Sequence, residues 1–112
     1  MADGTLPMTT ALELPGVRIT ENIGVCYGLV VRSMGLAGTF TAGFRALRRG
    51  EIPEYTQLLE DSRRHAIDRM VENAQLMGAD AIVAVRFDSS EIGQQFTEIV
   101  AYGTAVKVQS GS

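Results

Sequence analysis

The sequence predicts a small two-layer α+β domain of strand, helix, strand and strand, in which one long helix and a short one cover an antiparallel sheet. The hydrophobic period changes at Gly78, from a helical run that begins at Pro53 to an extended run over residues 81–87. Period-two patterns over residues 17–31 and 95–108 supply two more strands. The last two strands follow one another across a short polar loop, so we expect a hairpin and hence antiparallel pairing.

Length and composition indicate one globular domain. The chain has 112 residues, of which 46% are hydrophobic and 21% charged, and its formal net charge is -3. This balance gives no general attraction for polyanions, so we expect no nucleic-acid partner. The start of the chain lacks the pattern of a secretory signal, and no apolar run approaches the roughly 20 residues that cross a bilayer. We therefore expect a cytoplasmic protein without a membrane partner, with a domain over residues 8–108 and flexible ends over residues 1–7 and 109–112.

The first long strand has two different faces. One parity is apolar, apart from Glu21: Val17, Ile19, Ile23, Val25, Tyr27, Leu29 and Val31. The other parity carries small residues, among them Gly24, Cys26 and Gly28. Small residues allow close approach by another backbone or a helix, whereas a glycine in a strand can also mark a β-bulge. The sequence leaves both interpretations open. Residues 8–12 are interpreted as a short edge strand before the turn at Pro15 and Gly16.

Two helices are expected between the first and second strands. Residues 33–50 predict a short, glycine-containing helix with one apolar face and basic residues at its end. The long helix begins near Pro53, which suits the first helical position, and ends at Gly78, which suits a left-handed C-cap. Its apolar arc is wide, which favours contact with its own sheet and with a neighbouring subunit. The arginines of both helices alternate with acidic residues and indicate a solvated, salt-bridged surface.

The corner after the long helix carries Asp80, a residue with two interpretations. A carboxylate at the start of a strand can be catalytic. Aspartate also commonly accepts hydrogen bonds from nearby backbone N–H groups, and we favour that structural role. Gly103, in the last strand, is expected to allow close backbone approach.

Cys26 and His65 are the two soft donors and thus the candidate metal ligands. Cysteine usually packs as a small buried residue, but symmetry in an oligomer could bring copies of Cys26 together. His65 lies at the edge of the helix's apolar arc and four residues after Asp61, with which it could form a hydrogen bond. A divalent or soft metal ion is the cofactor that these residues suggest. No local pattern supports a nucleophilic enzyme.

Two runs resemble a known family: residues 78–86, Gly-Ala-Asp-Ala-Ile-Val-Ala-Val-Arg, and residues 101–106, Ala-Tyr-Gly-Thr-Ala-Val. Together with Tyr27-Gly28, and with Tyr55 at the start of the long helix, they resemble the YbjQ-like family of small proteins labelled "putative heavy-metal-binding", over residues 8–108. The resemblance implies a dodecin-like subunit assembled into a ring, for which we expect a pentamer. The family's Gly-Gly-Arg between the two helices is replaced here by residues 48–51, Arg-Arg-Gly-Glu.

The sequence and the resemblance together favour a non-enzymatic homo-oligomer that binds a heavy metal or a small ligand between its subunits. The independent physical reason is that the wide arc of the helix and the small-residue side of the first strand are more apolar than a monomer of this size should expose. A ligand-free scaffold for an unidentified protein partner is the alternative. An enzyme with an active site between subunits is less favoured.

Overall fold

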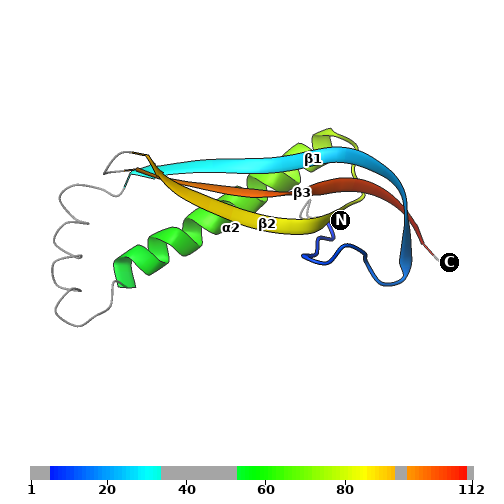
Figure 1. Ribbon diagram of the computed structural model, residues 1–112, viewed down its shortest axis with the longest axis horizontal. Coiled ribbons are helices and arrows are strands. Elements are labelled where there is room, and N and C mark those ends of the chain that lie inside the picture. The colour runs from blue at the N-terminus through cyan, green and yellow to red at the C-terminus, as the bar shows by residue number, and fades with distance from the viewer. Residues whose placement is uncertain (1–5, 34–52, 93–95, 111–112) are drawn as a thin grey trace.

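The computed structural model describes residues 6–33, 53–92 and 96–110, and these form one antiparallel sheet with one helix. The elements are β1 (Val17–Ser33), α2 (Pro53–Leu76), β2 (Ala81–Ile92) and β3 (Phe96–Ser110). The strand order is β1-β3-β2, and β3 pairs antiparallel with both neighbours. Figure 1 shows α2 crossing one face of this sheet. The predicted α+β class and antiparallel sheet are confirmed, while the predicted short helix lies outside the described residues.

The long helix ends as the sequence predicts, at a left-handed glycine. Gly78 has a φ of 86°, and its N–H donates to the carbonyl of Gln75 at 3.0 Å. The N–H of Ala79 donates to the carbonyl of Ala74 at 3.1 Å. These two bonds form a Schellman motif, which satisfies carbonyls at the helix end that would otherwise lack partners. The chain can therefore turn at once into β2.

The core lies between α2 and the small-residue side of β1. The helix packs mainly against β1, less against β3 and least against β2. The fully or almost fully buried residues of this layer come from all four elements: Cys26, Val30, Ala66, Met70, Val71, Ala74, Ile82, Val85, Ile99, Ala101 and Ala105. The small residues of β1 thus receive the helix, which was one of the two open interpretations.

The other interpretation, a bulge, also holds, but at a different glycine. Gly24 lies at a register shift between β1 and β3, where its φ is 153°. β1 has another register shift between Ile19 and Glu21, and a third irregularity interrupts the pairing of β2 with β3 between Val83 and Arg86, where Ala84 has a φ of 57°. One extra residue on one strand of an antiparallel pair bends that strand and increases its twist. These two glycines of β1 therefore have different structural roles: Gly28 contacts the helix, and Gly24 lies where the strand bends.

Strand β2 is longer than the sequence predicts. Residues 88–93 have the polar composition of a hairpin loop, yet β2 continues through Ile92, which pairs with Phe96. The predicted loop is wrong over residues 88–92. Strand propensity depends on context, and a full-length partner in β3 satisfies the backbone of these polar residues. At its far end β3 reaches Ser110, which pairs with Val17.

The segment before β1 covers the free edge of β2. The predicted strand over residues 8–12 is reduced to a single parallel bridge between Met8 and Ile82. Backbone bonds hold it there, from Thr9 N–H to the Ile82 carbonyl and from Val85 N–H to the Thr9 carbonyl, both at 3.0 Å. The chain then crosses to the other face of the sheet, where Leu14 packs on a small second cluster of Ala81, Val83 and Val106.

Candidate functional site

The face of β1 that points away from α2 is apolar and, within the residues that the structure describes, exposed. Val25 is 68% exposed, Tyr27 56%, Leu29 39% and Val31 50%. Side chains alternate across a strand, so these four share a face, opposite the buried residues between them. In the sequence this was the apolar parity of the strand. The structure shows that it is not the side that packs against the helix.

Strand β3 continues this surface across the sheet. Leu29 lies opposite Val100 and Tyr27 opposite Tyr102, and both β3 residues are partly exposed. At the end of the hairpin Ile92 and Phe96 form a pair on the same face and are also exposed, but Glu98, which lies opposite Val31, separates them from Val100. We call Val25, Tyr27, Leu29, Val31, Val100 and Tyr102 the open sheet face. Contiguous apolar surface on a small subunit commonly marks a contact with another protein chain.

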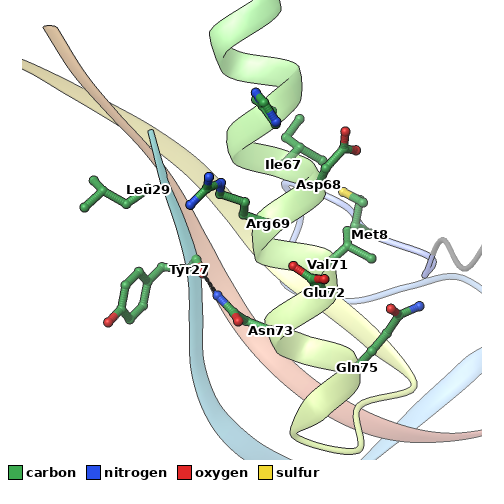
Figure 2. Close-up of a pocket in the computed structure, with 11 residues that line it drawn as sticks. Met8, Tyr27, Leu29, Ile67, Asp68, Arg69, Val71, Glu72, Asn73 and Gln75 are labelled. Carbon is green, nitrogen blue, oxygen red and sulfur yellow. Dashed lines mark hydrogen bonds between the residues drawn. The ribbon is translucent and has the colours of Figure 1, made fainter. Parts of the chain in front are cut away.

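An open groove of about 950 Å³ lies against α2, and its lining residues come from β1, from the helix and from the segment before β1, on both sides of the helix. Figure 2 shows Arg69 and Asn73 extending from the helix toward the part of β1 that carries Leu29 and Tyr27. Asn73 Nδ2 donates a hydrogen bond of 2.7 Å to the carbonyl oxygen of Tyr27. The other lining residues come from the helix and from the segment before β1: Met8, His65, Ile67, Asp68, Val71, Glu72 and Gln75. Charged and amide groups thus line this groove together with a few apolar ones.

Cys26, one of the two predicted metal ligands, is inside the core of the domain. It is 1% exposed, and its Sγ–H donates to the carbonyl oxygen of Gly103 at 3.7 Å. Burial raises the pKa of the Cys26 thiol above its ordinary value of 9.0, although hydrogen bonds from the backbone oppose this effect. A metal binds the thiolate form, so this environment disfavours the ligating state.

His65, the other predicted ligand, is exposed on α2. Its Nδ1 lies 3.1 Å from Nη2 of Arg32, at the end of β1. The predicted bond with Asp61 is replaced by this contact. The Asp61 carboxylate instead accepts hydrogen bonds from Gln57 Nε2 at 3.1 Å and Arg64 Nη1 at 3.3 Å. A histidine at this position can therefore contact β1 as well as solvent.

The two predicted ligands lie in different environments, one in the core and one at the surface. Among residues 6–33, 53–92 and 96–110, no group of three or more His, Cys, Asp or Glu side chains is arranged to hold a metal ion. A metal site using Cys26 and His65 stays a prediction, and it needs further ligands from outside the described part of one subunit.

Asp80 has the structural role that the sequence favoured. Its Oδ2 accepts a hydrogen bond of 3.1 Å from the backbone N–H of Val108, and its own N–H donates to the carbonyl of Val106 at 2.8 Å. The bonded N–H group belongs to β3 rather than to the helix corner itself. Lys107 Nζ also donates to the carbonyl of Gly78 at 2.9 Å. Both side chains fix the turn from α2 into β2.

The fold and these surfaces define a small α+β domain whose described part exposes an apolar sheet face. In the described part of the chain, no helix has the length and apolar character to cross a membrane. Residues 6–109 match the family model described as "Putative heavy-metal-binding". The chain belongs to this YbjQ family, as the sequence predicted.

Close relatives occur in bacteria and archaea. A UPF0145 protein of Bradyrhizobium sp. (strain ORS 278) is 54% identical over 102 residues, which span 91% of this chain and 92% of the relative. A UPF0145 protein of Sulfurisphaera tokodaii is 52% identical over 101 residues, which span 90% of this chain and 89% of the relative. The chain therefore matches nearly the whole length of these proteins.

A crystal structure supports the fold at greater distance. It is that of a protein of unknown function from Pediococcus pentosaceus, assigned to the DUF74 family. The TM-score is 0.57, with 17% sequence identity, over 93% of this chain and 98% of the other. At this identity the similarity concerns the fold.

Proposed function

We propose that this chain works as a homo-oligomeric binding protein whose subunits join through the open sheet face. The exposure of Val25, Tyr27, Leu29 and Val31 is the observation that carries the proposal. An apolar row on a strand is favourable in water only when another surface covers it. A second copy of the chain supplies such a surface without any other partner, and closed symmetric assemblies of identical subunits are the commonest oligomers.

A ring of five subunits is the assembly that the family resemblance suggests, and we carry it into the proposal. An elongated subunit with an apolar row along one side suits a closed ring, because each copy then meets two neighbours. The exposed residues at the C-terminal end of α2, Leu76 and Met77, are further candidates for such contacts.

The ligand in this proposal is a heavy metal, bound where subunits meet. The description of the family and the two soft donors support it. His65 is exposed, so its imidazole can bind a metal ion together with side chains of a neighbouring copy. Cys26 can bind the ion only after local opening of the core and loss of the thiol proton. The remaining ligands then come from another subunit.

Native mass measurement tests the assembly. We expect a multiple of 12.1 kDa, about 60 kDa for a pentamer. Val31→Lys places a charge in the apolar row and should shift the mass toward the monomer, while Gln57→Lys, on the exposed surface of α2, should leave it unchanged. A wild-type protein that stays at 12.1 kDa at micromolar concentration contradicts the proposal.

Metal uptake tests the ligand separately. Equilibrium dialysis against Zn²⁺ and Cu⁺ should show stoichiometric uptake by the intact oligomer, with loss of uptake in the Cys26→Ser, His65→Gln double variant. Equal uptake by the double variant would remove these two residues from the site. An intact oligomer without any uptake would favour the alternative, a ligand-free scaffold.

A further inference from the structure

The end of β1 contains an arginine whose donors are not fully used. Arg32 follows Val30 on the side of β1 that faces the helix, so its side chain lies between β1 and α2. Its Nε is buried and has no hydrogen-bond partner within the described part of the chain. A buried donor without an acceptor is unfavourable, and a charged one more so. This atom therefore indicates an acceptor that residues 6–33, 53–92 and 96–110 do not provide.

The contact between Arg32 and His65 identifies a second N–H donor, on the imidazole ring. Arginine carries five N–H donors, has no acceptor and is always protonated in proteins. In the 3.1 Å contact between Arg32 Nη2 and His65 Nδ1, the imidazole nitrogen must accept. In this contact His65 carries its proton on Nε2, and that N–H can donate to an anion, whereas binding of a metal by His65 requires loss of this proton or of the contact with Arg32.

Arg69 places a third donor group on the same side of the helix. It follows His65 by four residues, which puts both side chains on one helix face. Its Cβ contacts β1 beside Gly28, and both it and His65 line the groove. Figure 2 shows its guanidinium extending toward Leu29, while Asp68 points to the opposite side of the helix. Within the described ranges, neither Arg32 nor Arg69 forms an ion pair with a carboxylate.

We propose that Arg32, His65 and Arg69 form a binding site for an oxyanion, a carboxylate or a phosphate, at the junction of β1 and α2. The three side chains offer N–H donors without a carboxylate partner, and two of them are guanidinium groups. A planar fork of donors matches the oxygens of a carboxylate or phosphate. The orphaned Nε of Arg32 receives its acceptor when the anion binds.

The anion has two possible sources with the same chemistry, a free small oxyanion or a carboxylate side chain of a second copy. The site does not depend on the proposed function, because its three residues belong to one subunit and can bind a free anion in a monomer. The two sources differ in their response to dilution, since only the second requires contact between subunits.

NMR on the full-length, isotope-labelled protein tests the site through the Arg32 Nε–H signal and the His65 ring signals. Inorganic phosphate and sodium acetate are the probes. We expect a saturable shift of these signals with phosphate, and an affinity at least about tenfold lower in Arg32→Gln, as loss of a charge-assisted bond implies. Arg18→Gln is the matched control, since Arg18 is exposed on the same strand and its guanidinium bonds to the Gln109 side chain. Dispersed amide signals show that each variant is folded. Arg32→Lys keeps the positive charge but removes the planar set of N–H donors, so it tests whether charge alone binds the anion.

The outcomes separate the two sources and the failure of the proposal. A saturable response to phosphate that does not change on dilution identifies a free oxyanion. Signals that shift on dilution without phosphate, together with a lower native mass of Arg32→Gln, identify the carboxylate of a second copy. Signals of Arg32 and His65 that respond neither to the anions nor to dilution overturn the proposal. An unsaturable shift shared equally by Arg18 does so too.

Discussion

A Cβ built on Gly28 of β1 would lie 2.2 Å from the carbonyl oxygen of Ala66 in α2. It would also lie 2.4 Å from the backbone nitrogen of Met70. The strand and the helix therefore touch through their backbones, which explains why the helix presents the small residues Ala66 and Ala74 on this side.

Gly28→Ala should destabilise the protein strongly. The added methyl group meets backbone atoms, which cannot rotate away as the end of a flexible side chain can, so the helix must shift. We expect the free energy of unfolding to fall by about 3 kcal/mol, measured by denaturant titration. Gly16→Ala is the control, because apart from its chain neighbours no atom of the described residues lies within 4 Å of its added Cβ. Its cost, from the positive φ alone, should be about 1 kcal/mol. Equal losses for both variants would contradict a specific backbone contact.

The sequence predicts the order of elements well because period and capping are local signals. Pro53 and Gly78 bound the helix as expected, since their effects depend on their own backbone geometry. The small parity of β1 predicts close approach, but only the structure shows that Gly28 receives the helix and Gly24 lies at a bulge. That distinction depends on where α2 crosses the sheet, which no residue of β1 encodes alone.

Ala84→Gly should stabilise the protein slightly. Ala84 has a φ of 57° at the irregularity in β2, a conformation that costs a residue with a Cβ roughly 1–2 kcal/mol relative to glycine. Glycine also loses more entropy on folding, so the net gain should be at most about 1 kcal/mol. Thermal unfolding measures it. Ala101→Gly, in the regular and buried part of β3, should instead lower the stability, and a loss of similar size in both variants would contradict the strain at Ala84.

The hydrogen bond between Asp80 and Val108 predicts different effects for two substitutions. Asp80→Ala removes the acceptor for the Val108 N–H and should lower the free energy of unfolding by about 1 kcal/mol. Asp80→Asn keeps a side-chain oxygen in the same place, so its free energy of unfolding should fall by less than half as much as that of Asp80→Ala. Denaturant titration of both variants gives the comparison. Equal losses would mean that the charge of Asp80, rather than this bond, is what stabilises the corner.

The candidate site is less predictable from the sequence than the fold. Cys26 and His65 stand out as residue types, but their surroundings come from distant segments, Gly103 for the thiol and Arg32 for the imidazole. The apolar parity of β1 is plain in the sequence, yet its exposure is not, because either face of a strand can be the buried one until the helix is placed. Arg32 gives no signal in the sequence, since only packing leaves its Nε without an acceptor.

The buried thiol of Cys26 predicts how stability depends on pH. Its pKa in the folded state is raised above 9.0 by burial, while the unfolded chain titrates near the ordinary value. The folded protein therefore keeps its proton at pH values where the unfolded chain has lost it. The contribution to stability is complete below pH 9.0 and is lost as the pH rises from there toward the folded-state pKa.

Denaturant titrations between pH 7 and pH 10.5 should show this loss in the wild-type protein and a flatter profile in Cys26→Ala. Other groups that ionise in this range affect both proteins alike, so the difference between the two profiles isolates the thiol. At pH 8 a thiol reagent should modify native Cys26 slowly and the denatured chain rapidly, because the thiol is buried as well as protonated. Parallel pH profiles, combined with rapid modification of the native protein, would place Cys26 at an accessible surface and revive it as a ready metal ligand.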